Sequence, residues 1–152
     1  MLWPQFKDRE PELAAACQRL LGERHGYSYL ATVSRDSAPR IHPVAPILVA
    51  SGLFIAIRRD SPKGGDLIRN PRLALHASVV PPDDEEIAIR GHAHTAEDAA
   101  LRAAVRRQAR DGAVLTDAMS LFAIDLTNII WTRWTDSGAS HTTWTDPAAP
   151  PR

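Results

Sequence analysis

The sequence predicts a mainly β (α+β) domain in which six strands form an antiparallel barrel with helices at its flanks. Three observations lead to this class: short apolar or alternating segments recur along the chain, short turns join most of them directly, and helical patterns occur only at intervals. A parallel sheet would need a helical segment between successive strands. The pattern therefore indicates an antiparallel barrel or sandwich, and a small closed barrel is the favoured form.

Six segments have the composition of strands and are bounded by turn residues. They are residues 27–34, 40–49, 53–58, 73–80, 86–95 and 121–134. Pro43 and Pro46 confine the second segment to an edge or a bulged position, because proline has no amide proton to donate to a neighbouring strand. The turn at residues 50–52 leads directly into the third segment, which is typical of a meander.

Three further segments have helical signals, at residues 10–24, 61–70 and 97–110. In the first, Leu13, Cys17 and Leu20 recur at helical spacing and define an apolar face. Cys17 is the only cysteine, and we expect it to pack on that face rather than to act as a nucleophile. Thr95 is the expected cap of the third helix.

Length and charge restrict the class of protein. The 152 residues suit one domain, which we expect to span residues 1–146 and to end in a flexible proline-rich tail at residues 147–152. Eighteen basic and eighteen acidic side chains balance, without the clustered basic face of a nucleic-acid-binding module. No segment has the apolar length of a membrane helix, and the charged residues 7–10 interrupt any signal-peptide core. We therefore expect a cytoplasmic protein with no nucleic-acid or membrane partner.

The helix predicted at residues 61–70 starts in a way that suits phosphate binding. Ser61 is a good N-cap, Pro62 suits the first helical position, and Asn70 with Pro71 ends the helix. The first amides of a helix have no partner within it and lie at the positive end of its dipole. An anion at this end therefore gains both hydrogen bonds and field stabilisation.

Charges and glycines in the same segment agree with this interpretation. Lys63 and Arg58 are close enough in sequence to add full positive charges. Gly64 and Gly65 each cost about 1 kcal/mol against alanine in a helix, which indicates that a ligand or a packed strand approaches the backbone. An ordinary connection from strand to helix with a solvated lysine would also have this sequence. The glycine and lysine spacing of a Walker loop is absent.

The order of these features resembles the pyridoxamine 5'-phosphate oxidase family of flavin-binding split barrels. The resemblance extends from about residue 27 to residue 134, and its order is more specific than any single part. Its parts are the segments YLATV at 29–33, APRIHPV at 38–44, SPKG at 61–64, DL at 66–67, NPR at 70–72 and LALH at 73–76. The resemblance implies a homodimer of split barrels with two cofactor sites at the subunit interface, each holding FMN or a related cofactor. It also implies an oxidoreductase that acts on a small molecule, with electrons passing through the flavin.

The family's pattern assigns roles to particular residues of this chain. Arg40 and Lys63 match basic residues that hold the flavin phosphate, and Ser61 matches a polar neighbour. Ile57 and Arg58 match positions at a strand end that lie along the cofactor. An arginine fork suits a phosphate better than an ammonium group does.

Three further residues belong to the expected cofactor-binding set. His42 and Pro43 lie in the segment that contains Arg40, and His42 is the nearest candidate for an axial ligand if haem is bound instead. Trp144 either covers the flavin ring or packs at the edge of the dimer.

The sequence leaves the cofactor and the activity open. Pro62 stands where the family often has arginine, and Ile57 stands where threonine is common. A deazaflavin-dependent reductase on the same fold would need more cations for a longer phosphorylated tail, supplied by Arg58, Arg59 and Arg69. A non-enzymatic module that binds flavin or haem is also compatible with the sequence, and so is a dimer without cofactor. Vitamin oxidase activity itself is not expected, because the C-terminal segment differs from that of the oxidase.

No residue of the chain is predicted to be catalytic or to bind a metal. No side chain stands out as an acid or base, so the chemistry would be the cofactor's. His92 and His94 share one face of a strand, but zinc would need further ligands, and no cysteine or acidic residue has the matching spacing.

Overall fold

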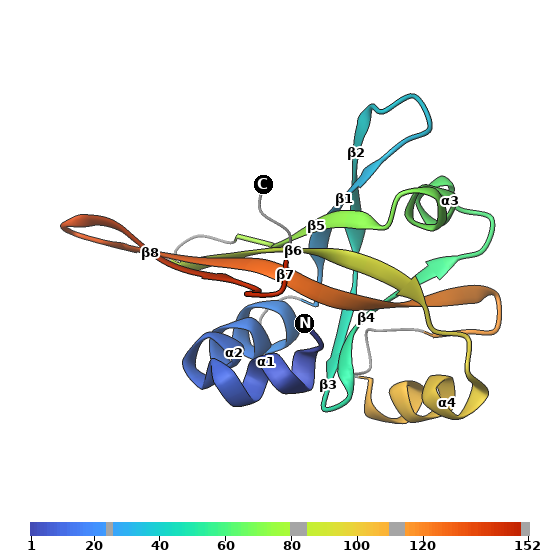
Figure 1. Cartoon of the computed structure of the whole chain (residues 1–152), viewed down its shortest axis with the longest axis horizontal. Helices are drawn as coiled ribbons and strands as arrows, with labels where there is room; N and C mark the ends of the chain where they lie inside the picture. The colour runs from blue at the N-terminus through green and yellow to red at the C-terminus, as the bar shows by residue number, and fades with distance from the viewer. Residues whose placement is uncertain (24–25, 80–84, 110–114, 150–152) are drawn as a thin grey trace.

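The computed structural model describes residues 1–23, 26–79, 85–109 and 115–149. Its strands form one curled antiparallel sheet, a half-barrel with helices packed against it (Figure 1). The strands are β1 (Ser28–Val33), β2 (Pro39–Val44), β3 (Pro46–Val49), β4 (Gly52–Arg58), β5 (Arg72–Ala77), β6 (Glu85–Thr95), β7 (Met119–Thr135) and β8 (Gly138–Thr145). The helices are α1 (Trp3–Arg9), α2 (Pro11–Cys17), the π-helical turn η1 (Gln18–Glu23), α3 (Pro62–Arg69) and α4 (Ala99–Gln108). The predicted mainly β antiparallel class is confirmed.

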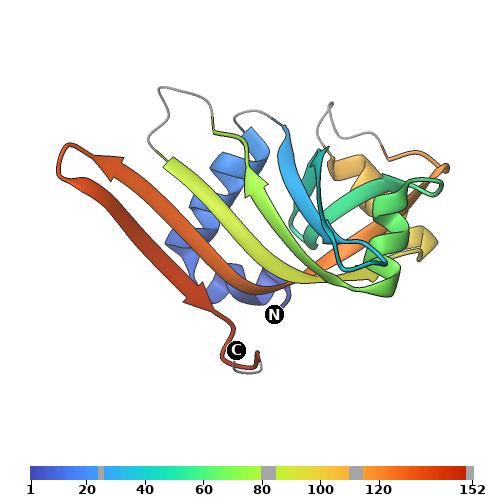
Figure 2. The same ribbon diagram turned by 90° about the horizontal axis from the view of Figure 1, so that it is seen from above.

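The longest strand, β7, holds the sheet together. The strand order is β2-β1-β5-β6-β7-β4-β3, and β8 pairs with β7 outside this path. The first residues of β7 pair with β4, its last residues pair with β8, and β6 runs beside both parts. The β7–β8 hairpin projects beyond the rest of the sheet (Figure 2). As a result, β2 and β3 lie at opposite ends of the strand order although they are neighbours in sequence.

Two apolar clusters stabilise the sheet. The larger cluster joins α1, α2 and η1 to the inner side of the sheet, with Trp3, Phe6 and Leu21 almost completely buried. The smaller one lies under α4, where Val105 contacts the cluster formed by β3, β4 and β7. Cys17 is buried in the larger cluster as predicted, and this burial raises the pKa of its thiol.

The strands differ from the prediction in two respects. The described residues contain eight strands rather than six. The segment predicted as one strand at residues 40–49 forms β2 and β3, because the chain leaves β1 after Val44 and pairs with β4 from Pro46 onward. The second addition is β8, whose exposed polar side chains show no apolar alternation.

The helices also differ from the prediction. The helix expected at residues 10–24 consists of α2 and η1, and α1 precedes it without a predicted counterpart. Thr95 is not the cap of α4: it ends β6, and Asp98 accepts a hydrogen bond from the amide of Leu101 at 2.8 Å. The connection between the predicted strands at 73–80 and 86–95, which the composition of residues 81–84 marks as a turn, lies outside the described residues, and so do the last residues of the expected tail, 150–152. None of the helices in the described ranges combines the length and apolar character needed to cross a membrane.

Candidate functional site

A cavity of about 280 Å³ lies between β2, β4 and the start of α3. Five of the residues nominated from the sequence line this cavity: Pro43, Ile57, Arg58, Ser61 and Lys63. The sequence did not indicate the remaining lining residues, which are Tyr27, Val44, Ala45, Ile47, Ala56 and Met119. Tyr27 and Met119 carry no local signal, because only the folding of β1 and β7 around β4 brings them to this place.

The start of α3 is open toward this cavity. Ser61 has extended backbone angles and Pro62 begins the helix, as the sequence predicted. The side chain of Ser61 makes no capping hydrogen bond, so no hydroxyl competes with a bound anion for the first amides. A Cβ atom added at Gly64 would make ordinary contacts with Ile57 and Arg58 of β4, whereas one at Gly65 would meet open space. Packing within the chain therefore requires neither glycine.

Lys63 and Arg58 both line the cavity, but only Arg58 has a carboxylate partner in the described residues. Lys63 is half-buried and forms no ion pair within the described part of the chain. Arg58 is exposed and donates two hydrogen bonds to the carboxylate of Asp60, at 3.0 and 2.6 Å. These bonds keep the pKa of Asp60 below its usual value. Of these two cations, Lys63 is therefore the one without a carboxylate partner in the described residues.

His42 and Arg40 lie near Lys63, on the edge strand β2. Both side chains are half-buried and alternate with exposed residues of the strand. The Nε2 atom of His42 is buried and has no hydrogen-bond partner in the described residues. Burial is the main reason that the pKa of His42 lies below its usual value, and the positive charges of Lys63 and Arg40 lower it further.

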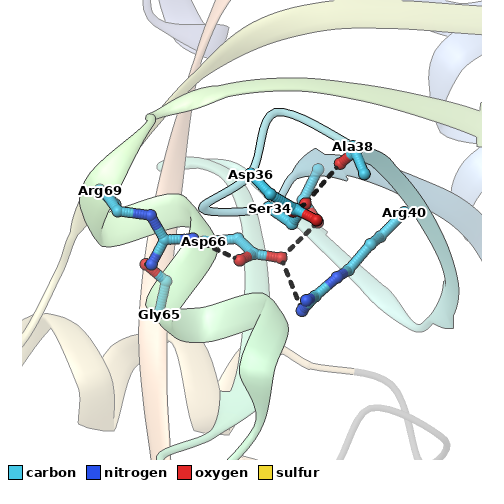
Figure 3. A network of polar contacts seen from close by, with 8 residues as sticks. Ser34, Asp36, Ala38, Arg40, Gly65, Asp66 and Arg69 are labelled. Carbon is cyan, nitrogen blue, oxygen red and sulfur yellow. Dashed lines mark hydrogen bonds and ion pairs between the residues drawn. The ribbon is translucent and has the colours of Figure 1, made fainter.

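Arg40 is held by a carboxylate that the sequence analysis did not single out. Its Nη1 atom lies 3.4 Å from Oδ2 of Asp66, in the second turn of α3. The Asp66 side chain is 3% exposed and also accepts hydrogen bonds from Thr32 at 3.1 Å and Arg69 at 2.6 Å. Figure 3 shows this carboxylate between the two arginines. The sequence contained one local signal for this role of Asp66: Arg69 follows it by three residues on the predicted helix, a spacing that favours an ion pair.

Trp144 lies away from the cavity. It belongs to β8, is 8% exposed, and its ring packs edge-on against Phe6 with 4.8 Å between ring centroids. Within this chain it is a core residue that packs under α1. Trp144, which was expected either to cover the cofactor ring or to pack at the edge of the dimer, therefore does not line this cavity.

The other histidines nominated as weak metal candidates are not grouped. His94 pairs with Asp125 at 2.7 Å. Three or more potential metal-binding side chains do not come together anywhere in the described ranges.

A second, more apolar cavity of about 220 Å³ lies on the outer face of β1, β5, β6 and β7. Tyr29 and Ile41 line it and are 52% and 70% exposed, which is unusual for side chains of this size. Tyr29 pairs across the strands with Pro43, which lines the first cavity. Because these paired residues lie on the same face of the sheet, the exposed apolar face and the candidate site are neighbours at this pair.

The half-barrel and the cation-lined cavity at the start of α3 define a split-barrel protein with a candidate cofactor site. The sequence model of the family described as pyridoxamine 5'-phosphate oxidase matches residues 13–131. The chain therefore belongs to the pyridoxamine 5'-phosphate oxidase family, and the resemblance drawn from the sequence is confirmed. No curated protein sequence matches the chain.

Solved structures of similar fold include proteins with different ligands in their names. A pyridoxamine 5'-phosphate oxidase-related, FMN-binding protein from Nostoc punctiforme has a TM-score of 0.66 and 13% identity, covering 91% of each chain. A heme-binding protein from Mycobacterium smegmatis has a TM-score of 0.64 and 19% identity, over 82% of this chain and 55% of that one. An F420 reductase has a TM-score of 0.57 and 20% identity, over 74% of this chain and 94% of that one. At these identities the likeness shows the shared fold.

Proposed function

We propose that this protein is a homodimeric FMN-binding oxidoreductase that acts on a small molecule, with each cofactor at the subunit interface. The observation that carries the proposal is the half-buried, unpaired Lys63 at the open start of α3, within the part of the chain that the structure describes. A cation held without a carboxylate partner at the positive end of a helix favours a phosphate as its partner.

The other residues around the cavity fit the same ligand. The orphaned Nε2 atom of His42 offers a buried hydrogen-bonding position beside Lys63. Arg40 does not line the cavity but adds a guanidinium group near His42, while Ile57, Ala56 and Val44 give the cavity an apolar wall for a flat ring. When bound, FMN would supply the electron transfer, and the residues of this chain would hold its phosphate and orient its ring.

A second subunit is part of the proposal for two reasons. The cavity of about 280 Å³ in one chain is at the lower limit of the roughly 300–1,000 Å³ of typical ligand pockets, and a second copy would add walls to it. The exposed apolar face with Tyr29 and Ile41 lies next to that cavity, because Tyr29 pairs with the lining residue Pro43. A second copy covering this face would bury the exposed apolar side chains and complete the walls of the site.

The charges favour FMN over a deazaflavin with a longer anionic tail. The three arginines considered for such a tail each have a carboxylate partner: Arg58 pairs with Asp60, Arg59 with Glu97 and Arg69 with Asp66. A tail would have to compete with these partners. The phosphate of FMN needs only Lys63 and the partly engaged Arg40.

Titration of the purified protein with FMN, followed by flavin fluorescence, tests this function. We expect saturable binding of one FMN per subunit, tighter than the binding of riboflavin, which lacks the phosphate. The bound flavin, once reduced chemically, should pass electrons to small acceptors such as a quinone or oxygen. Preference for F420 or haem over FMN would contradict the proposed cofactor, and bound FMN that reduces no acceptor would favour a non-enzymatic flavin-binding module.

A further inference from the structure

Asp66 joins three elements of the fold at the edge of the candidate site. Its carboxylate accepts hydrogen bonds from Thr32 of β1 and Arg69 of α3, and it forms an ion pair with Arg40 of β2. The side chain is 3% exposed, so these groups replace the water that an ionised carboxylate would otherwise bind. A buried charge of this kind is costly unless it is well partnered, and the three partners of Asp66 meet that requirement.

We propose that Asp66 is a positioning residue that holds the guanidinium of Arg40 where it binds the phosphate of the cofactor. The proposal rests on the FMN site proposed above. It adds a role for a residue that does not line the cavity. Arg40 does not line the cavity of the single chain either, but its charge acts on His42 together with that of Lys63, which does line it.

The geometry of Arg40 supports this role. Arg40 lies on β2, at the end of the strand order, and its side chain is 41% exposed, so within the described residues the contact with Asp66 is what restricts it. That contact is a single one of 3.4 Å to Nη1, and it leaves the other N–H groups of the five-donor guanidinium free for an anion. A guanidinium that is already in place loses less conformational entropy when a phosphate binds.

The charges at Asp66 also suit an anion site. Asp66 faces two guanidinium groups, those of Arg40 and Arg69, which leaves one net positive charge on the trio. Arg69 makes the shorter contact, at 2.6 Å, and so neutralises the carboxylate more strongly than Arg40 does. Arg40 therefore keeps most of its attraction for a phosphate while Asp66 fixes its position.

A double-mutant cycle separates this role from a structural one. The measured quantity is the ratio of the dissociation constants for riboflavin and FMN, which isolates the contribution of the phosphate. We expect Arg40→Ala to lower this ratio at least five-fold in the wild-type protein and less than two-fold in the Asp66→Asn protein. Thr32→Val serves as the control, because it removes a different hydrogen bond to Asp66 and should lower only the melting temperature.

Each outcome of the cycle decides a different question. An equal effect of Arg40→Ala in the wild-type and Asp66→Asn proteins would overturn the positioning role and leave the FMN site intact. A wild-type protein that binds FMN no better than riboflavin would instead overturn the proposed function, and the role of Asp66 with it. If Asp66→Asn does not fold, NMR of the Arg40 side chain in the wild-type protein decides: a resolved Nη–H signal from a guanidinium that rotates slowly supports the anchored side chain, and Nη–H signals averaged by fast rotation overturn it.

Discussion

At the scale of single residues, the partners of each cation decide which one is available to a ligand. The sequence places both Arg58 and Lys63 near the start of the helix. The structure shows that Asp60 occupies Arg58 with two hydrogen bonds, whereas Lys63 is unpaired within the described residues. An ion pair between residues two apart on a turn has no reliable sequence signal, so this difference was not predictable. The sequence did indicate that these residues converge on one site.

Replacing Lys63 with alanine tests its assignment. We expect the affinity for FMN to fall about 10- to 100-fold, the worth of a charged hydrogen bond, and the affinity for riboflavin to stay unchanged. The melting temperature without cofactor should also stay the same, because Lys63 has no ion pair to lose in the described structure. Lys7 is the only other lysine and lies exposed on α1, so Lys7→Ala is a matched control. FMN binding that survives in Lys63→Ala would show that the phosphate binds elsewhere.

The pKa of His42 should depend measurably on its charged neighbours. Because burial and the charges of Lys63 and Arg40 lower its pKa, an NMR titration should place its midpoint below the ordinary value of about 6.5. As the pH falls below that value, the unfolded chain takes up this proton before the folded one does, so the free energy of unfolding decreases. Lys63→Ala should raise the midpoint. A midpoint at or above the ordinary value would contradict the proximity of these residues.

At the scale of secondary-structure elements, local patterns predicted the existence of most elements, while tertiary partners set their limits. Pro43 and Pro46 correctly indicated edge positions, since β2 and β3 end the strand order on opposite sides. The division between them depends on two different partner strands, β1 and β4, which no local pattern records. The sequence did not predict β8, because its side chains are polar and do not alternate with apolar ones. It is a strand because it pairs with β7.

The cap of α4 gives a direct test at this scale. Asp98→Ala should lower the free energy of unfolding by about 1 kcal/mol, because the amide of Leu101 loses its acceptor. Asp98→Asn should preserve most of the stability, since asparagine is also a good cap. Thr95→Ala removes the residue that the sequence suggested and should have little effect. Urea unfolding of the three variants measures these differences, and a larger loss in Thr95→Ala than in Asp98→Ala would contradict the observed helix start.

At the scale of the whole molecule, the exposed apolar face lies next to the candidate cavity. Tyr29 and Ile41 lie on this face, and the pairing of Tyr29 with Pro43 connects it to the cavity. A sequence pattern predicts that apolar and polar side chains alternate along a strand, but it does not predict which face of the sheet the rest of the chain leaves exposed. The resemblance to the family supplied the expectation of a dimer, and the position of these side chains indicates where the subunits would meet.

Ile41→Asp should disrupt subunit association and cofactor binding together. A carboxylate in the proposed interface would be costly to bury, so sedimentation should show monomers and the affinity for FMN should fall at least ten-fold. Ile68 on α3 is equally exposed, at 70%, but does not line the outer cavity, so Ile68→Asp is a matched control that should leave the dimer intact. Dimers that persist in Ile41→Asp would place the subunit interface on another surface.

The visible absorption spectrum of the purified protein, recorded before and after heat denaturation with and without added FMN, tests the central claim most directly. The proposed function predicts a two-band flavin spectrum. Denaturation should release the flavin, and the released flavin should be FMN. A sharp Soret band would contradict this and indicate haem, with His42 as the first residue to examine. A colourless protein that takes up no FMN would contradict the flavin site itself.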